Sequence, residues 1–277
     1  MSGVPAFVRW LTRVGIIPRA AIAQLDPHRV PEAQSVLNAG ALAELTYRVL
    51  DELDEDLVLI ARAGQNLERF GLTYSHLGFA VRNHQASGWS IVHLLTAEDF
   101  ADSRLYEEGV ANFFSDRPHR FEAGILTLPA DVRDATLRIL RRHGARLHNS
   151  RYSLTSYPWQ TATQNSNQWI LEILACAIAG PNHIPEPSRE AAQTWLKAAG
   201  YRPSQLAIPL YTQWAGPLLR STISFEDQPA ESRRQGIVST VTVDSVITFL
   251  CDANSPLGNR RHSCRLLKLD LESALLA

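Results

Sequence analysis

Two hydrophobic patterns alternate along the first part of the chain. Apolar residues at three- and four-residue spacing predict a helix over 32–53. Shorter apolar or alternating runs follow, and two of them flank the polar turn HQASG, which favours a hairpin. The strands predicted in this way are 56–62, 74–83, 89–95 and 120–128. Together they predict one antiparallel sheet packed against helices, that is, an α+β fold.

The pattern after residue 128 is mainly helical. Pro129 and Gly144 mark the start and end of one predicted helix. Further helices are predicted over 166–179 and 188–201, a strand leading into a helix over 236–250, and a short helix and loop at 104–116. We expect a single α+β domain over 31–252, in which 181–252 is an elaboration. Residues 1–30 are an N-terminal amphipathic extension, and 253–277 is a C-terminal tail for which disorder is left open.

Composition narrows the class of protein. The 277 residues are 45% hydrophobic and 20% charged, as in ordinary globular domains. The net charge is -1 and no long basic run occurs, so we expect no nucleic-acid partner. Three scattered cysteines without metal-ligand spacing predict no disulfide scaffold, no metal and no cofactor.

The N-terminal extension does not have the pattern of a signal peptide, because Arg9 and Arg13 interrupt its apolar run. Residues 5–17 predict a short helix that either packs on the domain or contacts a membrane surface or a partner. No stretch of about 18 apolar residues is present, so we expect no transmembrane segment. A cytoplasmic location is therefore expected, with a periplasmic or exported one left open.

The candidate chemistry centres on the stretch TQNSNQWILEILACAIAG. Four polar residues, Gln164, Asn165, Ser166 and Asn167, precede the apolar face of the helix. One side chain is enough to cap a helix. Ser166 could be that cap, or it could be a nucleophile that gains from the helix dipole and the free backbone N–H groups.

Two histidines lie inside predicted strands and could serve such a nucleophile. Alternation places Tyr74, His76 and Gly78 on one face of their strand. If the hairpin pairs residues whose numbers sum to 171, His93 lies opposite Gly78 and diagonal to His76. A sum of 170 would place His93 on the other face, so the prediction depends on the register.

The residue types then suggest a division of roles. Ser166 would attack, His76 would act as general base and His93 would orient His76. The amides of Gln164 and Asn165 would help line the oxyanion side. The candidates for the oxyanion or substrate site as a whole are Gln164, Asn165, Asn167 and Tyr74. The alternative is a capping serine with polar neighbours in a loop.

Several stretches together resemble a bacterial family known as domain of unknown function 2145, over about residues 40–250. They are YSHLGFAVRN, WSIVHLL, LYEEGVANFFSD, YSLTSYPWQTATQNSNQW and TVTVDSVITFL. More remotely, the order of elements resembles the permuted branch of the papain-like superfamily, which includes NlpC-type peptidases and the lecithin retinol acyltransferase group. This second resemblance implies a papain-like fold, with His76 as base, His93 as orienting group and position 166 as the nucleophile.

The chain departs from that superfamily at one position, because the superfamily uses cysteine where this sequence has Ser166. Three accounts stay open: a native catalytic serine, a native serine in a chain that only binds, and a serine that replaces a cysteine. The corresponding functions are a hydrolase or acyltransferase that acts through an acyl-enzyme, or an inactive module that binds a peptide or lipid. A third is an exported toxin-type cell-wall amidase. Candidate substrates are peptides, cell-wall material and lipid acyl groups.

Overall fold

The computed structural model describes residues 33–84, 88–96, 102–115, 118–208 and 223–275. Residues 34–277 form one compact unit. The N-terminal extension at 1–30, including the expected helix at 5–17, lies outside the described residues. None of the helices within the described ranges is long and apolar enough to cross a membrane.

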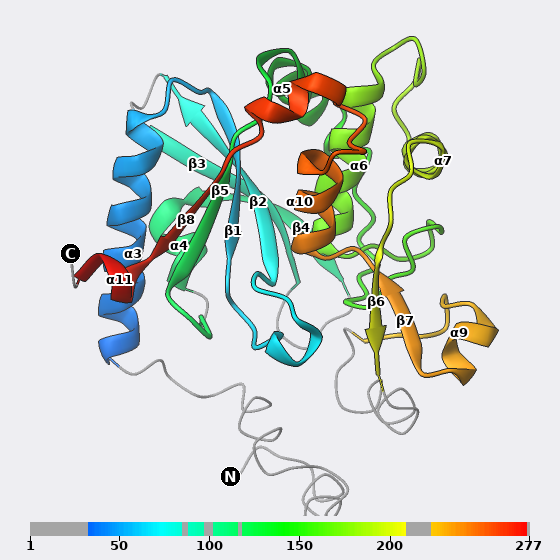
Figure 1. Cartoon of the computed structure of the whole chain (residues 1–277), viewed down its shortest axis with the longest axis horizontal. Coiled ribbons are helices and arrows are strands. Elements are labelled where there is room, and N and C mark those ends of the chain that lie inside the picture. The colour runs from blue at the N-terminus through cyan, green and yellow to red at the C-terminus, as the bar shows by residue number, and fades with distance from the viewer. Residues whose placement is uncertain (1–32, 85–87, 97–101, 116–117, 209–222, 276–277) are drawn as a thin grey trace, which may run out of the picture. The chain divides into compact units, whose positions relative to one another are not determined.

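The unit is built around a six-stranded sheet in which every neighbouring pair of strands is antiparallel (Figure 1). The strand order is β4-β3-β2-β1-β5-β8. The strands are β1 (Leu57–Arg62), β2 (His76–Asn83), β3 (Gly88–Thr96), β4 (Ser103–Gly109), β5 (Glu122–Leu126) and β8 (Leu266–Asp270). The predicted antiparallel sheet of the four earlier strands is confirmed, and β4 and β8 extend it at its two edges.

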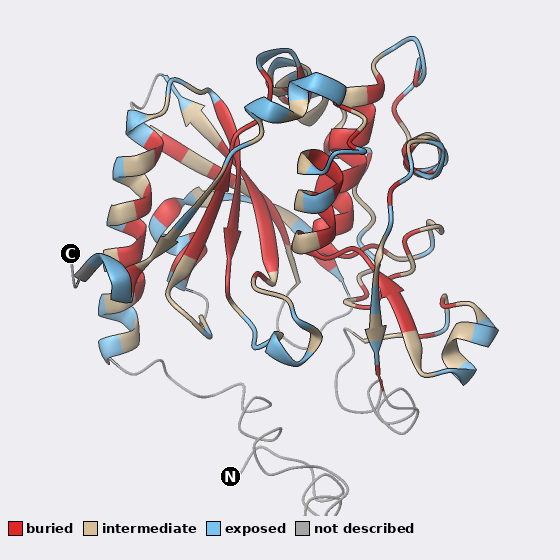
Figure 2. Cartoon of the chain, in the orientation of Figure 1, coloured by how far each residue is buried: buried red, intermediate tan, exposed pale blue. Residues whose placement is uncertain are grey.

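Helices cover both faces of the sheet (Figure 1). The helices α3 (Ala33–Glu52) and α4 (Val110–Ser115) lie on one face, while α6 (Ser166–Ala179) and α10 (Val243–Cys251) lie on the other. Strand β1 serves both faces, because Val58 and Ile60 join the core under α3 and Leu57 and Leu59 join the core under α6. Buried residues consequently run through both layers (Figure 2).

The remaining elements surround these two layers. The helix α5 (Ala130–His143) packs on α6, and α7 (Arg189–Ala198) also packs on α6. The strands β6 (Ser204–Ala207) and β7 (Ile237–Thr240) form a separate two-stranded sheet, next to α9 (Ala230–Arg234). The short elements are η1 (Glu68–Phe70), η2 (Gly258–Ser263) and α11 (Leu271–Leu275).

Two segments differ from the predictions. The stretch expected to be a short helix and loop begins as strand β4, because its polar residues pair along the edge of β3 rather than forming a helical face. The C-terminal tail contains the strand β8, which pairs with β5 from Leu266 to Asp270. Both differences arise from pairing between segments, which local periodicity does not report.

Candidate active site

The candidate site begins at the N-terminus of α6. Asn165 caps this helix, since its Oδ1 accepts the backbone N–H of Gln168 at 2.7 Å. The Asn165 amide also donates to Thr240 Oγ1 at 2.9 Å, which ties the helix start to β7. Ser166 is the first residue of the helix and is 5% exposed. Capping is thus performed by Asn165, and the Ser166 hydroxyl takes part in different contacts.

The partners of that hydroxyl include the two strand histidines. His76 Nδ1 lies 3.2 Å from Ser166 Oγ. The other ring nitrogen of His76, Nε2, lies 2.8 Å from Nδ1 of His93. All three side chains are buried. The structure therefore brings the serine and the two histidines together in one continuous run of hydrogen bonds.

The hairpin register explains why the histidines meet. Strand β2 pairs with β3 so that Phe79 faces Val92, which is the register with a sum of 171. The same register places His93 opposite Gly78, on the face that His76 shares. A Cβ atom added at Gly78 would come within 2.8 Å of Ile91 Cγ2 and 3.4 Å of His93 Cβ. A larger residue at this position would clash with Ile91, so glycine leaves room for the side chains of β3 on this face.

The surroundings of His76 keep its imidazole neutral. Burial lowers the pKa of His76 well below its ordinary value of 6.5, and the positive charge of Arg62 and the neighbouring His93 lower it further. Arg62 is itself buried, donates to the carbonyl of Phe113 and lies 5.0 Å from the centre of its ring. A neutral imidazole has one free lone pair, so His76 can accept a proton at neutral pH.

A carboxylate that the sequence analysis missed lies next to His93, the last residue in this run of hydrogen bonds. Glu108 Oε1 lies 2.9 Å from Nε2 of His93. Glu108 belongs to β4, in the segment that was expected to be a helix and loop, so its face could not be assigned from the sequence. The pairing of β4 with β3 is what assigns Glu108 to the face that His93 occupies.

Tyr152 is a second residue that the sequence analysis missed. Burial raises the pKa of Tyr152 to about 12, and the proximity of the Ser166 side chain and backbone opposes part of this rise. The tyrosine is therefore a neutral hydroxyl beside the serine at neutral pH. It lies in the loop before α6, where no periodicity marks it.

The structure gives Gln164 a different place from the predicted oxyanion or substrate role. Its amide donates to the carbonyl of Leu147 at 2.9 Å and to Glu172 Oε2 at 2.6 Å, and its Oε1 accepts the N–H of Asn149. The side chain is 0% exposed. Gln164 therefore serves the packing of the loop before α6. The same applies to the Asn165 side chain, whose contacts are those of a helix cap.

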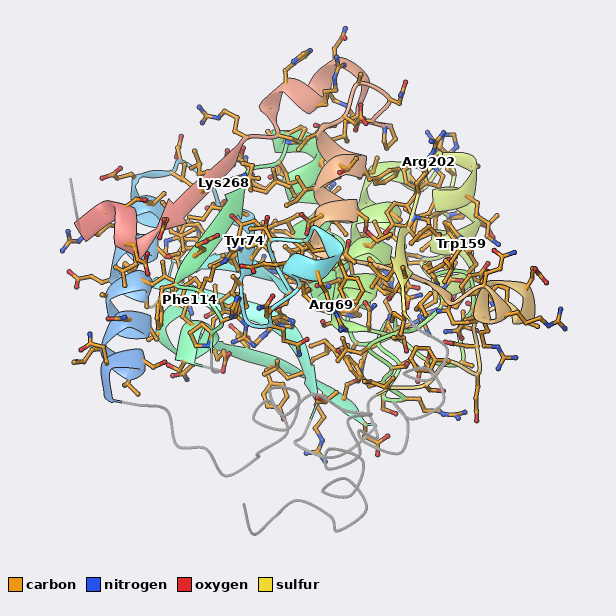
Figure 3. The ribbon with its side chains drawn as sticks, turned by 60° about the horizontal axis from the view of Figure 1, so that its bottom comes forward. Arg69, Tyr74, Phe114, Trp159, Arg202 and Lys268 are labelled. Carbon is orange, nitrogen blue, oxygen red and sulfur yellow. The ribbon has the colours of Figure 1, made fainter. Side chains whose placement is uncertain are left out.

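Asn167 and Tyr74 contribute in other ways. Asn167 donates to the carbonyl of Ser75 at 3.4 Å, which fixes the start of α6 beside the residue that precedes His76. The Oδ1 atom of Asn167 is buried and has no hydrogen-bond partner within the described residues. Tyr74, labelled in Figure 3, lies before β2. Its ring packs against Gly124 of β5. Its hydroxyl donates to the carbonyl of Ala123 at 3.4 Å, so Tyr74 belongs to the core and not to the chain of hydrogen bonds around Ser166.

A buried ion pair holds the loop that carries Tyr152. Arg189 of α7 lies 2.8 Å from Glu172 of α6, and neither side chain is more than 7% exposed. Arg189 also donates to the backbone carbonyls of Thr161 at 2.9 Å and Thr163 at 3.0 Å. The ion pair consequently fixes the end of this loop against two helices. Backbone hydrogen bonds of Arg151 and Ser153 with Gln164 hold Tyr152 beside the start of α6.

The fold and the site together define an α+β protein in which a serine at a helix N-terminus bonds to a buried pair of histidines on an antiparallel sheet. Residues 49–250 match the model of a family described as an uncharacterised protein conserved in bacteria, DUF2145. The chain belongs to this family. No curated protein and no solved structure matches it.

Proposed function

We propose that this protein is a hydrolase or acyltransferase that attacks an amide, thioester or ester and forms a covalent acyl-enzyme at Ser166. The observation that supports this most directly is the chain of hydrogen bonds from Ser166 Oγ through His76 to His93. A nucleophile, a base and a group that orients the base are the parts that such chemistry requires.

The first step is attack by Ser166 Oγ on the carbonyl carbon of the substrate. His76 accepts the hydroxyl proton at Nδ1 as the Oγ–carbon bond forms. His76 then returns this proton to the leaving amine, thiol or alcohol as its bond to the carbonyl carbon breaks. Water or an acyl acceptor attacks the acyl-enzyme next, again with His76 as the base, and releases the acyl group from Ser166.

In this proposal two donors stabilise the oxyanion that forms in each step. The backbone N–H of Ser166 is one, because the first N–H groups of a helix have no partner within it. The hydroxyl of Tyr152 is the other, because Ser166 is among the groups that influence its pKa and the hydroxyl stays protonated at neutral pH. In this proposal Tyr152 takes the role that the sequence analysis gave to the amides of Gln164 and Asn165.

The order of these elements further supports a remote relationship to the permuted papain-like superfamily. The base on the first strand of a hairpin, the orienting group on the second and the nucleophile at a later helix start all follow that order. The relationship is compatible with peptide, cell-wall or lipid acyl substrates. Within it, Ser166 takes the place of the usual cysteine.

A fluorophosphonate probe tests the proposal directly. Ser166 Oγ would bond to phosphorus, fluoride would leave, and the proton would pass to His76. We expect one adduct, located at Ser166 by peptide mass spectrometry and lost in Ser166→Ala. His76→Ala should slow labelling by about 10²–10⁴-fold, the usual contribution of general-base catalysis. Ser188→Ala, which removes the cap of α7 outside this site, should label like the unmodified protein.

The hydroxyl at position 166 favours a second candidate function, a catalytically inactive module that binds a peptide or lipid at this site. A serine needs strong assistance from a base, whereas a thiol is partly ionised near neutral pH. In that case the folded protein would form no fluorophosphonate adduct. A rate that is unchanged in His76→Ala would also contradict the catalytic proposal.

A further inference from the structure

The contact between His93 and Glu108 determines which ring nitrogens donate and which accept in the hydrogen bonds around His76. Glu108 Oε1 lies 2.9 Å from Nε2 of His93, and the histidine side chain is 0% exposed while that of Glu108 is 21% exposed. Pairing between β3 and β4 places Glu108 opposite Ile91, two residues along β3 from His93. The two side chains are therefore diagonal neighbours on one face of the sheet.

A neutral imidazole carries one N–H and one lone pair. A carboxylate only accepts, and a lone pair at 2.9 Å from it would be repelled, so the proton of His93 lies on Nε2. His93 Nδ1 is then an acceptor, and the His76 nitrogen that faces it at 2.8 Å, Nε2, carries the proton of His76. The lone pair of His76 consequently lies on Nδ1, facing the hydroxyl of Ser166.

The reverse arrangement would satisfy the contact between the two histidines equally well. His93 would carry its proton on Nδ1 and donate to His76, and His76 would carry its own proton on Nδ1. That nitrogen would then donate to Ser166 Oγ and could not accept its proton. The contact between the two rings cannot choose between these arrangements, so the choice depends on the partner of His93 Nε2.

We propose that Glu108 is a positioning residue that fixes the direction of this chain, so that His76 presents a lone pair to Ser166. The catalytic consequence of this inference rests on the proposed function. Which nitrogen of each histidine carries the proton can be measured without any reaction. A close contact with a charged group shifts such an equilibrium by about ten- to a hundredfold.

The experiment compares Glu108→Leu, Glu108→Gln and Glu107→Leu with the unmodified protein. Glu107 is the matched control, because it is the exposed neighbour on β4 whose side chain points to the other face. ¹⁵N NMR of histidine-labelled protein near pH 7.5 reports which nitrogen of each ring carries the proton, and fluorophosphonate labelling reports the rate at Ser166.

We expect both histidines to be protonated on Nε2 in the unmodified protein and in Glu107→Leu. Glu108→Leu should populate the Nδ1 forms and slow labelling by about ten- to a hundredfold. Glu108→Gln should keep the Nε2 forms and label faster than Glu108→Leu, because its amide oxygen can still accept. Unchanged Nε2 forms in Glu108→Leu would overturn the inference. A shift to Nδ1 in Glu108→Leu, in a protein that never labels, would refute the proposed function and leave the role of Glu108 intact.

Discussion

Replacing Ser166 with cysteine tests whether the surroundings of this position are built for a nucleophile. The new thiol would lie at the start of α6 with His76 Nδ1 beside it, in the place of the present contact at 3.2 Å. An ordinary thiol has a pKa of about 8.5, and helix N-termini and neighbouring histidines lower it to about 3.5–7.5. The low end of that range requires a histidine that readily becomes charged. Because burial and Arg62 oppose a charge on His76, we expect the pKa of the new thiol to fall by about two units.

The size of the effect follows from this shift. A fall from about 8.5 to about 6.5 raises the thiolate fraction at pH 6 from about 0.3% to about 24%, which is roughly 75-fold. The less basic thiolate is also less nucleophilic, with a Brønsted coefficient of about 0.4–0.5, so the net gain in rate is about tenfold. We therefore expect Ser166→Cys to react with iodoacetamide at pH 6 about ten times faster than a cysteine in an unfolded peptide.

Peptide mass spectrometry separates this thiol from the three native ones. Cys176 should stay silent, because it is 2% exposed and burial raises its pKa to about 12. Ser188→Cys is the matched control, since it places a thiol at the N-terminus of α7 outside the site. Adding His76→Ala to Ser166→Cys should remove most of the gain. If the thiol at position 166 reacts no faster than the peptide, with or without His76, the reasoning about this site is wrong.

Three further predictions follow from the contacts described above. Tyr152→Phe should slow fluorophosphonate labelling by about 10²–10³-fold, the usual effect of losing one oxyanion donor, while thermal unfolding shows that the fold persists. Arg189→Leu should lower the free energy of unfolding by about 3–5 kcal/mol in urea titrations, because it leaves the buried Glu172 without its ion partner; Arg189→Leu combined with Glu172→Leu should recover part of that loss. His76 has a lowered pKa in the folded state, so below pH 6.5 the unfolded chain binds the proton more readily. The free energy of unfolding should therefore decrease as the pH falls from about 6.5 to the pKa of His76 in the folded state. The decrease should be smaller in His76→Gln. If the unmodified protein and His76→Gln depend equally on pH, the lowered pKa of His76 is contradicted.

The two histidines could be found from the sequence because they belong to one hairpin. Period-two alternation assigns a face to each residue of a strand, and a short turn brings the two strands together. The remaining ambiguity was the register, because a shift of one residue moves His93 to the other face. The packing of Ile91 and His93 against Gly78 settles this in the structure. A glycine in the middle of an apolar strand was therefore an informative signal.

Glu108 and Tyr152 could not be found in the same way. Strand β4 is an edge strand whose polar residues show no clear alternation, and its pairing with β3 is what determines the direction of each side chain. Tyr152 lies beside the start of α6 because backbone hydrogen bonds join its neighbours Arg151 and Ser153 to Gln164. Both positions depend on contacts between distant segments, and local propensity carries no information about these.

The polar block before α6 shows how closely spaced residues can have unrelated tasks. Gln164 bonds into the buried network around Glu172, Asn165 caps the helix, and Asn167 holds the carbonyl of Ser75. These three contacts fix the start of α6 from three directions, and none of them uses the hydroxyl of Ser166. The position of Ser166 is thus set by its neighbours, so replacing it should change the chemistry at this point while the helix stays in place. A nucleophile requires such an arrangement, because neighbouring residues must position the attacking atom while its own lone pairs and proton stay available for the reaction.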